Sequence, residues 1–86
     1  MTTLEKIQPV FRDVFDDESI TVTETTVAAD VEDWDSFAQM QIVMGIEQMF
    51  GIKFSTDEVT NFKNVGDIVK TIEKHVGWDK AWIIYL

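Results

Sequence analysis

Apolar residues recur every three or four positions in three long stretches of this chain, which is the spacing of helices that bury one face. The first stretch consists of Leu4, Ile7, Phe11, Val14 and Phe15. It predicts a helix that ends near Asp16 and Asp17. Pro9 leaves the start of the regular helix open, because a proline either kinks a helix or stands in its first turn.

The second stretch, residues 36–50, is the clearest helix. Ser36 and Gln39 form a capping-box pattern that predicts its start, and Gly51 predicts its end. At about 100° per residue, one side of this helix carries Ile42, Val43, Ile46, Met49 and Phe50. The opposite side carries Phe37, Met40 and Met44. Only one side can face a core, so the second stripe is either covered by another part of the chain or left for a partner.

Two further helices complete the pattern. Ser55 and Glu58 form a second capping pattern and predict a short helix. Asn64 predicts the start of the last long helix and Gly77 its end. The inward residues of these two helices are Val59, Phe62, Val65, Ile68, Val69, Ile72 and Val76.

Residues 20–35 have no sustained helical period, and their brief alternation at 20–23 has no partner strand, so they predict an extended connecting loop. The fold class is therefore all-α, a small four-helix bundle of three longer helices and one short one. Residues 1–77 form this single domain. Residues 78–86 are an apolar extension, with Trp78, Ala81, Trp82 and Tyr85 at helical spacing. We expect them to pack on the bundle, the alternative being a docking tail.

The charge narrows the range of partners. The 86 residues carry a net charge of -9, which repels nucleic acid and anionic lipid, so neither is an expected partner. No apolar run is long enough to span a membrane, and no basic-then-apolar leader is visible at the start. We expect a cytoplasmic monomer. The absence of cysteine excludes a disulfide framework and a thiolate nucleophile, so any thiol chemistry needs an added group.

Several kinds of site are disfavoured. The acids Asp30, Glu32, Asp33 and Asp35 lack the central glycine of a calcium-binding EF-hand loop, and we expect no metal. His75, the only histidine, suits the dipole at the end of the last helix. Because Ser36 has no evident base, no catalytic residue is predicted and the protein is not expected to be an enzyme. A serine at a helix start is most often a cap, but a helix start also stabilises an attached phosphate.

The chain resembles the acyl carrier protein family in the segments Trp34-Asp35-Ser36-Phe37, Phe50-Gly51-Ile52 and Asn64-Val65-Gly66-Asp67-Ile68. The resemblance covers nearly the whole chain, from about Leu4 to about Val76. The resemblance implies a four-helix bundle with a 4'-phosphopantetheine arm on Ser36. A phosphopantetheinyl transferase would donate the arm from coenzyme A and recognise the serine partly through Asp35. The thiol of the arm would hold acyl groups as thioesters and present them to acyl-loading and acyl-processing enzymes.

The resemblance also implies two further sets of residues. A docking face for partner enzymes would be formed by Phe37, Met40, Gln41, Met44, Glu47 and Gln48. A core able to shelter a short acyl chain would be lined by Ile42, Ile46, Phe50, Ile68 and Ile72. Phe37 replaces the leucine usual after the serine, a mild departure that keeps an apolar residue.

A second departure concerns charge. The helix after Ser36 is strongly acidic in typical fatty acid carriers, whereas here Glu47 is its only acid. This charge pattern disfavours the housekeeping fatty acid carrier. The Trp34-Asp35-Ser36 form instead resembles freestanding carriers of specialised pathways, such as polyketide or mixed peptide assembly. Two alternatives stay open: a peptidyl or D-alanyl carrier, and an unmodified helical interaction module.

Overall fold

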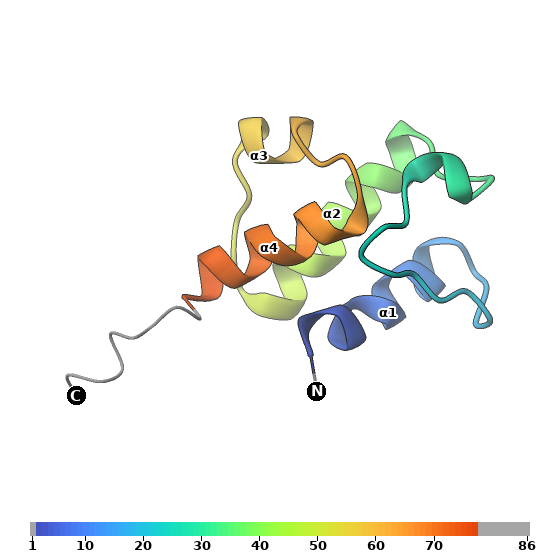
Figure 1. The fold of residues 1–86 in the computed structure, drawn as a ribbon, viewed down its shortest axis with the longest axis horizontal. Helices are drawn as coiled ribbons and strands as arrows, with labels where there is room; N and C mark the ends of the chain where they lie inside the picture. The colour runs from blue at the N-terminus through green and yellow to red at the C-terminus, as the bar shows by residue number, and fades with distance from the viewer. Residues whose placement is uncertain (1, 78–86) are drawn as a thin grey trace.

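The computed structural model describes residues 2–77, which form a helical bundle in which no strand occurs (Figure 1). A short 3-10 turn, η1, stands within the long loop. The elements are α1 (Thr3–Val14), η1 (Ala28–Asp30), α2 (Ser36–Phe50), α3 (Thr56–Thr60) and α4 (Val65–Val76). The predicted fold class, a bundle of three longer helices and one short one, is confirmed.

Helix α1 begins before Pro9 and includes it. Thr2 caps the helix: its hydroxyl accepts from the Glu5 backbone N–H at 3.1 Å, and the Glu5 carboxylate accepts from the Thr2 N–H at 2.8 Å. Helix α1 ends at Val14, slightly before the end predicted near Asp16 and Asp17. Asp16 takes a left-handed conformation with φ 50°, which short polar side chains tolerate and which ends a helix.

The predicted boundaries of the other helices largely hold. In α3 the Ser55 hydroxyl accepts from the Glu58 N–H at 3.1 Å, and the Glu58 carboxylate accepts from the Ser55 N–H at 2.9 Å. The Asn64 side chain caps α4 by accepting from the Asp67 N–H at 2.8 Å. Glycines in the left-handed region, at φ 66° and 75°, end α2 and α4.

A single hydrophobic core joins the helices. Its largest fully buried side chains are Phe11, Ile7, Ile42, Ile46, Ile68, Ile72, Val22 and Val65. Each such side chain contributes about 1.5–3 kcal/mol when it leaves water. Met49, predicted to face inward, is instead exposed, because it lies at the edge of the buried stripe of α2. Phe50 packs against the core only in part.

The long loop is fastened to α1 by polar side chains. The Gln8 amide donates to the Val22 carbonyl at 2.8 Å and accepts from the Val22 N–H at 2.9 Å. This side chain therefore satisfies the backbone of an extended segment that has no partner strand. The Arg12 guanidinium donates to the Ile20 carbonyl at 2.8 Å. Periodicity could not reveal these contacts, since they join segments distant in sequence.

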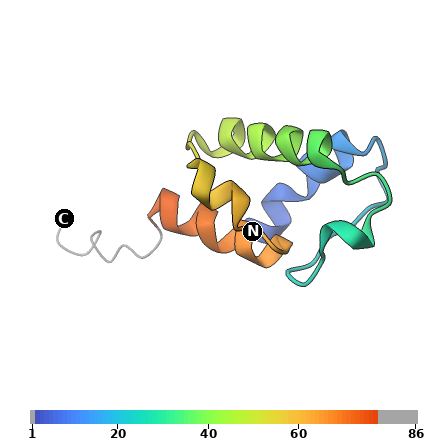
Figure 2. The same cartoon turned by 90° about the horizontal axis from the view of Figure 1, so that it is seen from above.

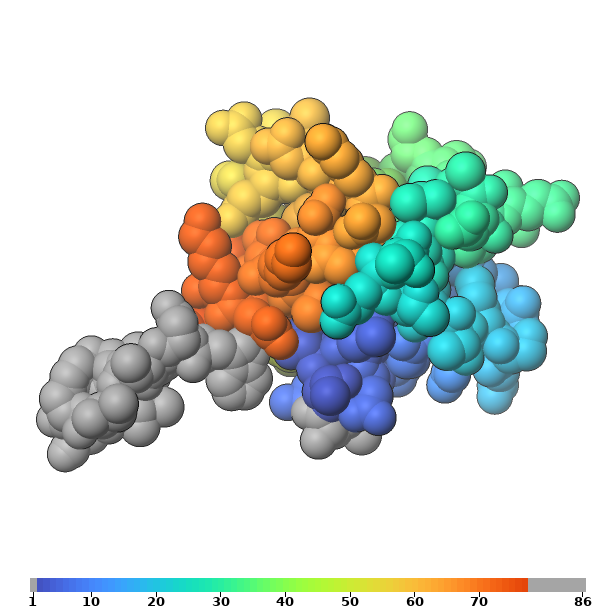
Figure 3. Space-filling model, in the orientation of Figure 1, coloured from blue at the N-terminus to red at the C-terminus, as the bar shows by residue number. Residues whose placement is uncertain are grey.

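The same loop also closes the start of α4. The first backbone N–H groups of α4 donate to loop carbonyls, Val65 to Thr26 at 2.9 Å and Gly66 to Glu24 at 2.8 Å. A Cβ atom on Gly66 would lie 2.8 Å from the Glu24 carbonyl oxygen, so the approach requires glycine. Figure 3 shows the loop lying against the bundle between α1 and the start of α4.

The predicted packing of residues 78–86 lies outside the described residues, and the division of the chain at residue 77 stays a prediction. Within the described residues no helix has the length and apolar character needed to cross a membrane.

Candidate functional site

Ser36 is the first residue of α2, and its side chain is exposed. The helix is capped not by Ser36 but by Asp35, whose carboxylate accepts from the Ala38 N–H at 2.9 Å. The predicted capping box of Ser36 and Gln39 is therefore wrong. The Ser36 hydroxyl makes no hydrogen bond within the described part of the chain, which leaves it open to modification.

Trp34 fixes the turn that presents Ser36. Its indole N–H donates to the Gln39 side-chain oxygen at 2.7 Å. This bond joins a residue two positions before Ser36 to a residue three positions after it. The indole ring lies 5.5 Å from the Phe11 ring and 5.9 Å from the Phe15 ring, measured between centroids. Because both phenylalanines lie at the C-terminal end of α1, the turn is held to α1 as well as to α2.

Acidic residues precede Ser36 in the loop. Asp30 accepts from the Val27 N–H at 2.9 Å and so caps η1, whereas Glu32 and Asp33 are exposed and their carboxylates bond no described residue. No group of three potential metal ligands occurs among residues 2–77. Glu32 and Asp33 are thus solvated acids of the loop segment that leads into Ser36.

The surroundings of Ser36 fit an attached phosphate ester. The backbone N–H groups of Ser36 and Phe37 belong to the first turn of α2 and donate to no described residue. Such groups, together with the positive end of the helix dipole, favour a phosphate. The carboxylate of Asp35 opposes this in part, but its charge is already directed at the Ala38 N–H.

The second apolar stripe of α2 is not covered by the described residues. Phe37 is 69% exposed, Met40 54% and Met44 51%. Figure 2 shows α2 along one long side of the bundle, with α3 and α4 on its inner side. We call these three residues the apolar face of α2. Burial of the stripe, which the sequence left open, is absent within the described residues.

The other three predicted docking residues differ among themselves. Gln41 and Gln48 are exposed. Glu47 is half-buried, and its carboxylate accepts from the Phe54 N–H at 2.9 Å. The side chain of Glu47 therefore ties α2 to the segment before α3, a structural task that periodicity did not indicate.

A groove of about 800 Å³ separates α2 from α3. Met40 and Met44 form part of its α2 wall, and Val59 of α3 lies opposite. The groove is also lined by Glu47, by Lys53 and by Phe54, whose backbone N–H is bonded to Glu47. The groove opens beside the apolar face, so the two form one continuous, mostly uncharged surface.

The predicted acyl-chain residues lie in the core. Four of them are at most 1% exposed, namely Ile42, Ile46, Ile68 and Ile72, while Phe50 is half-buried. Because the four isoleucines are packed in the core, a sheltered acyl chain would have to displace their side chains. Their role with cargo stays a prediction.

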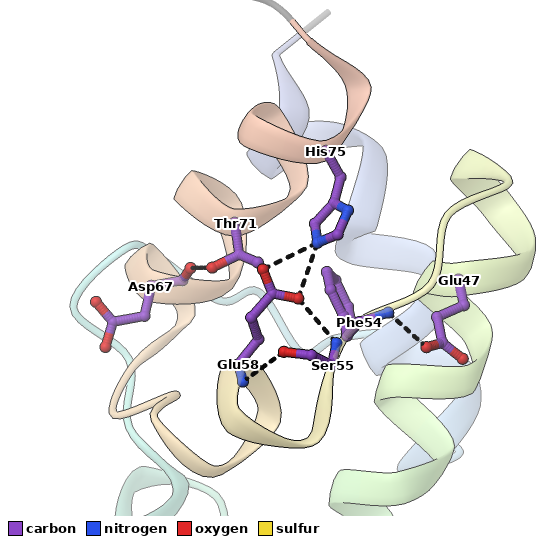
Figure 4. A network of polar contacts seen from close by, with 7 residues as sticks. All are labelled: Glu47, Phe54, Ser55, Glu58, Asp67, Thr71 and His75. Carbon is purple, nitrogen blue, oxygen red and sulfur yellow. Dashed lines mark hydrogen bonds and ion pairs between the residues drawn. The ribbon is translucent and has the colours of Figure 1, made fainter.

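His75 takes part in a polar network that the sequence did not indicate. Its Nε2 lies 2.8 Å and 3.0 Å from the two carboxylate oxygens of Glu58, which joins α4 to α3 (Figure 4). The Ser55 backbone N–H, and after it the His75 side chain, lower the pKa of Glu58 below its ordinary value. The histidine ring also stands edge-on to Phe54, 5.6 Å away. The partner of His75 is thus Glu58, in a structural pair, and not Ser36.

Comparisons with known proteins find one matching family and several relatives. The family described as "Phosphopantetheine attachment site" matches residues 5–72. The acyl carrier protein of Lactobacillus acidophilus is 32% identical over 72 residues, covering 84% of this chain and 90% of the relative. That of Helicobacter pylori is 29% identical over 73 residues, covering 85% and 94%.

A solved structure is similar as well. The solution NMR structure of a holo acyl carrier protein from Geobacter metallireducens superimposes with a TM-score of 0.83 at 40% identity. The match covers 90% of this chain and 88% of that one.

Proposed function

This chain belongs to the acyl carrier protein family, whose prosthetic group is 4'-phosphopantetheine, and on that premise we propose that the group is attached to Ser36. The observation that carries the proposal is the exposed Ser36 hydroxyl, which is not used as a cap because Asp35 takes that place. The unengaged N–H groups of the first turn would hold the phosphate.

When bound, the group supplies a thiol, which this cysteine-free chain lacks, for carrying acyl groups as thioesters. The residues of the chain itself hold and present the attachment point. Trp34 and Gln39 fix the turn, and Asp35 fixes the start of α2. The carrier thereby offers the transferase a rigid acceptor, which lowers the entropic cost of docking.

The six docking residues and the five acyl-chain residues belong to the same proposal. Partner enzymes, namely the transferase and the acyl-loading and acyl-processing enzymes, would contact the outer side of α2. Five of the six docking residues keep side chains available there, whereas Glu47 is bonded to the Phe54 N–H. Short cargo would enter the core only when the buried isoleucines move apart.

The pathway is proposed to be a specialised one, of polyketide or related type, and not housekeeping fatty acid synthesis. The support is the sparse charge of α2, because Glu47 is its only acid and points to a backbone N–H. The relatives described above are named acyl carrier proteins, which favours acyl cargo over aminoacyl cargo.

The attachment site is tested by intact mass after incubation with coenzyme A and a broad-specificity phosphopantetheinyl transferase. Wild type should gain one phosphopantetheine, and Ser36→Ala should gain none while keeping the same circular dichroism spectrum. Modification of Ser36→Ala, or a folded wild type that stays unmodified beside an active transferase, would contradict the assignment.

Cargo and pathway need a second experiment with the modified protein. Loading reactions with acyl-coenzyme A donors and with adenylating enzymes plus amino acids distinguish an acyl carrier from an aminoacyl carrier. Reconstituted fatty acid synthesis enzymes should elongate acyl groups on this chain more slowly than on a carrier with an acidic second helix. Equal rates would contradict the specialised pathway.

A further inference from the structure

A second groove, of about 490 Å³, lies between α1 and α2. It is lined by Pro9, Val10, Asp13 and Val14 from α1 and by Gln41, Gly45, Gln48 and Met49 from α2. Val10 and Gly45 form its floor, since Val10 is buried and a Cβ atom on Gly45 would lie 3.0 Å from Val10 Cγ1. Pro9 and Met49 are exposed, one on each wall. Within residues 2–77 this α1–α2 groove is therefore open to solvent.

We infer that residues 78–86 of the same chain bind in the α1–α2 groove and cover Met49. In sequence this segment is Trp-Asp-Lys-Ala-Trp-Ile-Ile-Tyr-Leu, and its only charged side chains are Asp79 and Lys80. A segment this apolar gains free energy by leaving water. The matching family model ends at residue 72, so the segment lies beyond the part of the chain that the family describes. The inference does not depend on the modification of Ser36.

The groove is within reach of this segment, because the Thr3 hydroxyl donates to the Glu73 carboxylate at 3.0 Å and so places the last turns of α4 beside the start of α1. Gly77 lies four residues beyond Glu73, about 6 Å along α4. Pro9 lies six residues beyond Thr3, about 9 Å along α1. Crossing one helix adds roughly 10 Å, and the resulting path of about 25 Å is shorter than the ~30 Å that nine extended residues span.

The surface along this path is apolar. The start of α1, the end of α2 and the end of α4 lie towards the same end of the bundle (Figure 1, Figure 2). The side chains that are only partly buried against the core there are Leu4, Phe50, Ile52 and Val76. The route over α3 is different, because the groove between α3 and α4 is lined by charged residues that include Asp57, Lys70 and Lys74. An apolar segment that crossed there would remove those charges from water, which is unfavourable.

The chain's own segment fits the groove better than a second copy does. Asp13 is the one charged residue that lines the groove, and the opposite charges of Asp79 and Lys80 cancel within the segment. A second copy would instead bring its own net charge of -9, and the two molecules would repel each other. The tethered segment is present at an effective concentration on the order of millimolar. Its tryptophans also suit Met49, because a thioether sulfur packs favourably against aromatic rings.

Peroxide oxidation of methionine tests the inference in the intact chain. Met49 and Met44 are matched probes on α2, 45% and 51% exposed, and cleavage after Glu47 separates them into different peptides for mass spectrometry. In Trp78→Gln/Trp82→Gln the ratio of the Met49 rate to the Met44 rate should rise about threefold or more over wild type, because oxidation follows exposure. The Met44 rate itself should not change. Urea denaturation establishes that the variant is folded.

A control variant, Asp79→Asn/Lys80→Gln, changes the same segment without removing apolar groups and should keep the wild-type ratio. An equal ratio in wild type and the tryptophan variant, or an equal rise in the control, would overturn the inference. A rise at Met44 instead would overturn it by placing the segment on the apolar face of α2. Protection of Met49 that disappears on dilution would overturn it in favour of a second copy.

These outcomes are independent of the proposed function, because oxidation of the unmodified protein needs no phosphopantetheine. Failure of the oxidation test leaves the carrier function in place, and a Ser36 that accepts no phosphopantetheine leaves the binding of residues 78–86 in place.

Discussion

Helices α2 and α4 have similar lengths, 15 and 12 residues, but their outer sides differ, since that of α2 is apolar and that of α4 is charged. Helix α4 buries Ile68, Val69 and Ile72 and turns lysines outward. Helix α2 buries Ile42, Val43 and Ile46 but leaves the apolar face in solvent. Both helices contribute buried side chains to the core, so core packing cannot explain why only α2 has an apolar outer side.

What differs is the use of the outer side. An apolar stripe that stays exposed costs solubility and gains no packing energy, so it is typical of a surface kept for a partner. Substitutions on the two sides should therefore have different effects. Substitutions of inner residues should change the free energy of unfolding, and substitutions on the outer side of α2 should change the kinetics with partner enzymes. The predictions below test this separation, beginning with the largest effect.

The largest effect is expected for Ile72→Ala in α4. Ile72 is completely buried in the core, so its truncation should lower the free energy of unfolding by about 2–5 kcal/mol. Met44→Ala, on the outer side of α2, should change it by less than about 0.5 kcal/mol. Urea denaturation followed by circular dichroism measures both. Similar losses in the two variants would mean that the apolar face also stabilises the fold.

A pair of glycines extends the comparison to helix contacts. The Cβ of Gly66→Ala would lie 2.8 Å from the Glu24 carbonyl oxygen, so the loop must shift, at a cost of about 1–3 kcal/mol. The Cβ of Gly45→Ala in α2 would lie 3.0 Å from Val10 Cγ1, a side-chain atom that can move.

Alanine also favours a helix over glycine by about 1 kcal/mol, which offsets the contact at Gly45. We therefore expect the free energy of unfolding of Gly45→Ala to lie within about 1 kcal/mol of the wild-type value. Thermal unfolding of the two variants side by side checks the difference. A larger loss for Gly45→Ala than for Gly66→Ala would show that the contact of α1 with α2 is tighter than that of the loop with α4.

Much of this fold follows from the sequence, since the helical period and the caps at Ser55, Asn64, Gly51 and Gly77 predict most helix boundaries. The start of α2 was harder to predict. Asp35 and Ser36 are adjacent and both can cap, so local pattern cannot choose between them. The choice depends on tertiary structure, because Gln39 accepts from the Trp34 indole instead of completing a capping box with Ser36.

Contacts between distant segments were also beyond the sequence. The bonds of Gln8 to Val22 and of His75 to Glu58 join residues 14 and 17 positions apart. Each requires the bundle to form first, and each uses a polar residue that periodicity places only on a surface. Exposure of the apolar face belongs to the same class, because an apolar stripe alone does not tell whether another segment covers it.

The start of α2 provides the next test. Asp35→Ala removes the observed cap and should lower the free energy of unfolding by about 1 kcal/mol. Ser36→Ala removes a hydroxyl without partners and should change it by less than about 0.5 kcal/mol. Urea denaturation of the two apo variants at equal salt measures the difference. If Ser36→Ala were the more destabilised variant, the serine hydroxyl would be acting as the cap after all.

The smallest effect is expected at the end of α4, where two basic residues are adjacent. His75 pairs with Glu58, whereas Lys74 is exposed, and both stand in the last turn. A role in the helix dipole alone predicts equal effects of His75→Gln and Lys74→Gln. The pair predicts a larger loss for His75→Gln, although below about 1 kcal/mol because the pair is partly solvated.

Acid pH distinguishes the two explanations further. Bonds from Ser55 and then His75 lower the pKa of Glu58 in the folded protein below its ordinary value of 4.5. The stabilisation is therefore fully present above that value and is lost as the pH falls through the lower, folded pKa. Urea denaturation at about pH 6 and about pH 3 should therefore show a smaller His75→Gln deficit at the lower pH. A deficit that persists in acid, or that Lys74→Gln shares, would assign the effect of His75 to the helix dipole and not to its pair with Glu58.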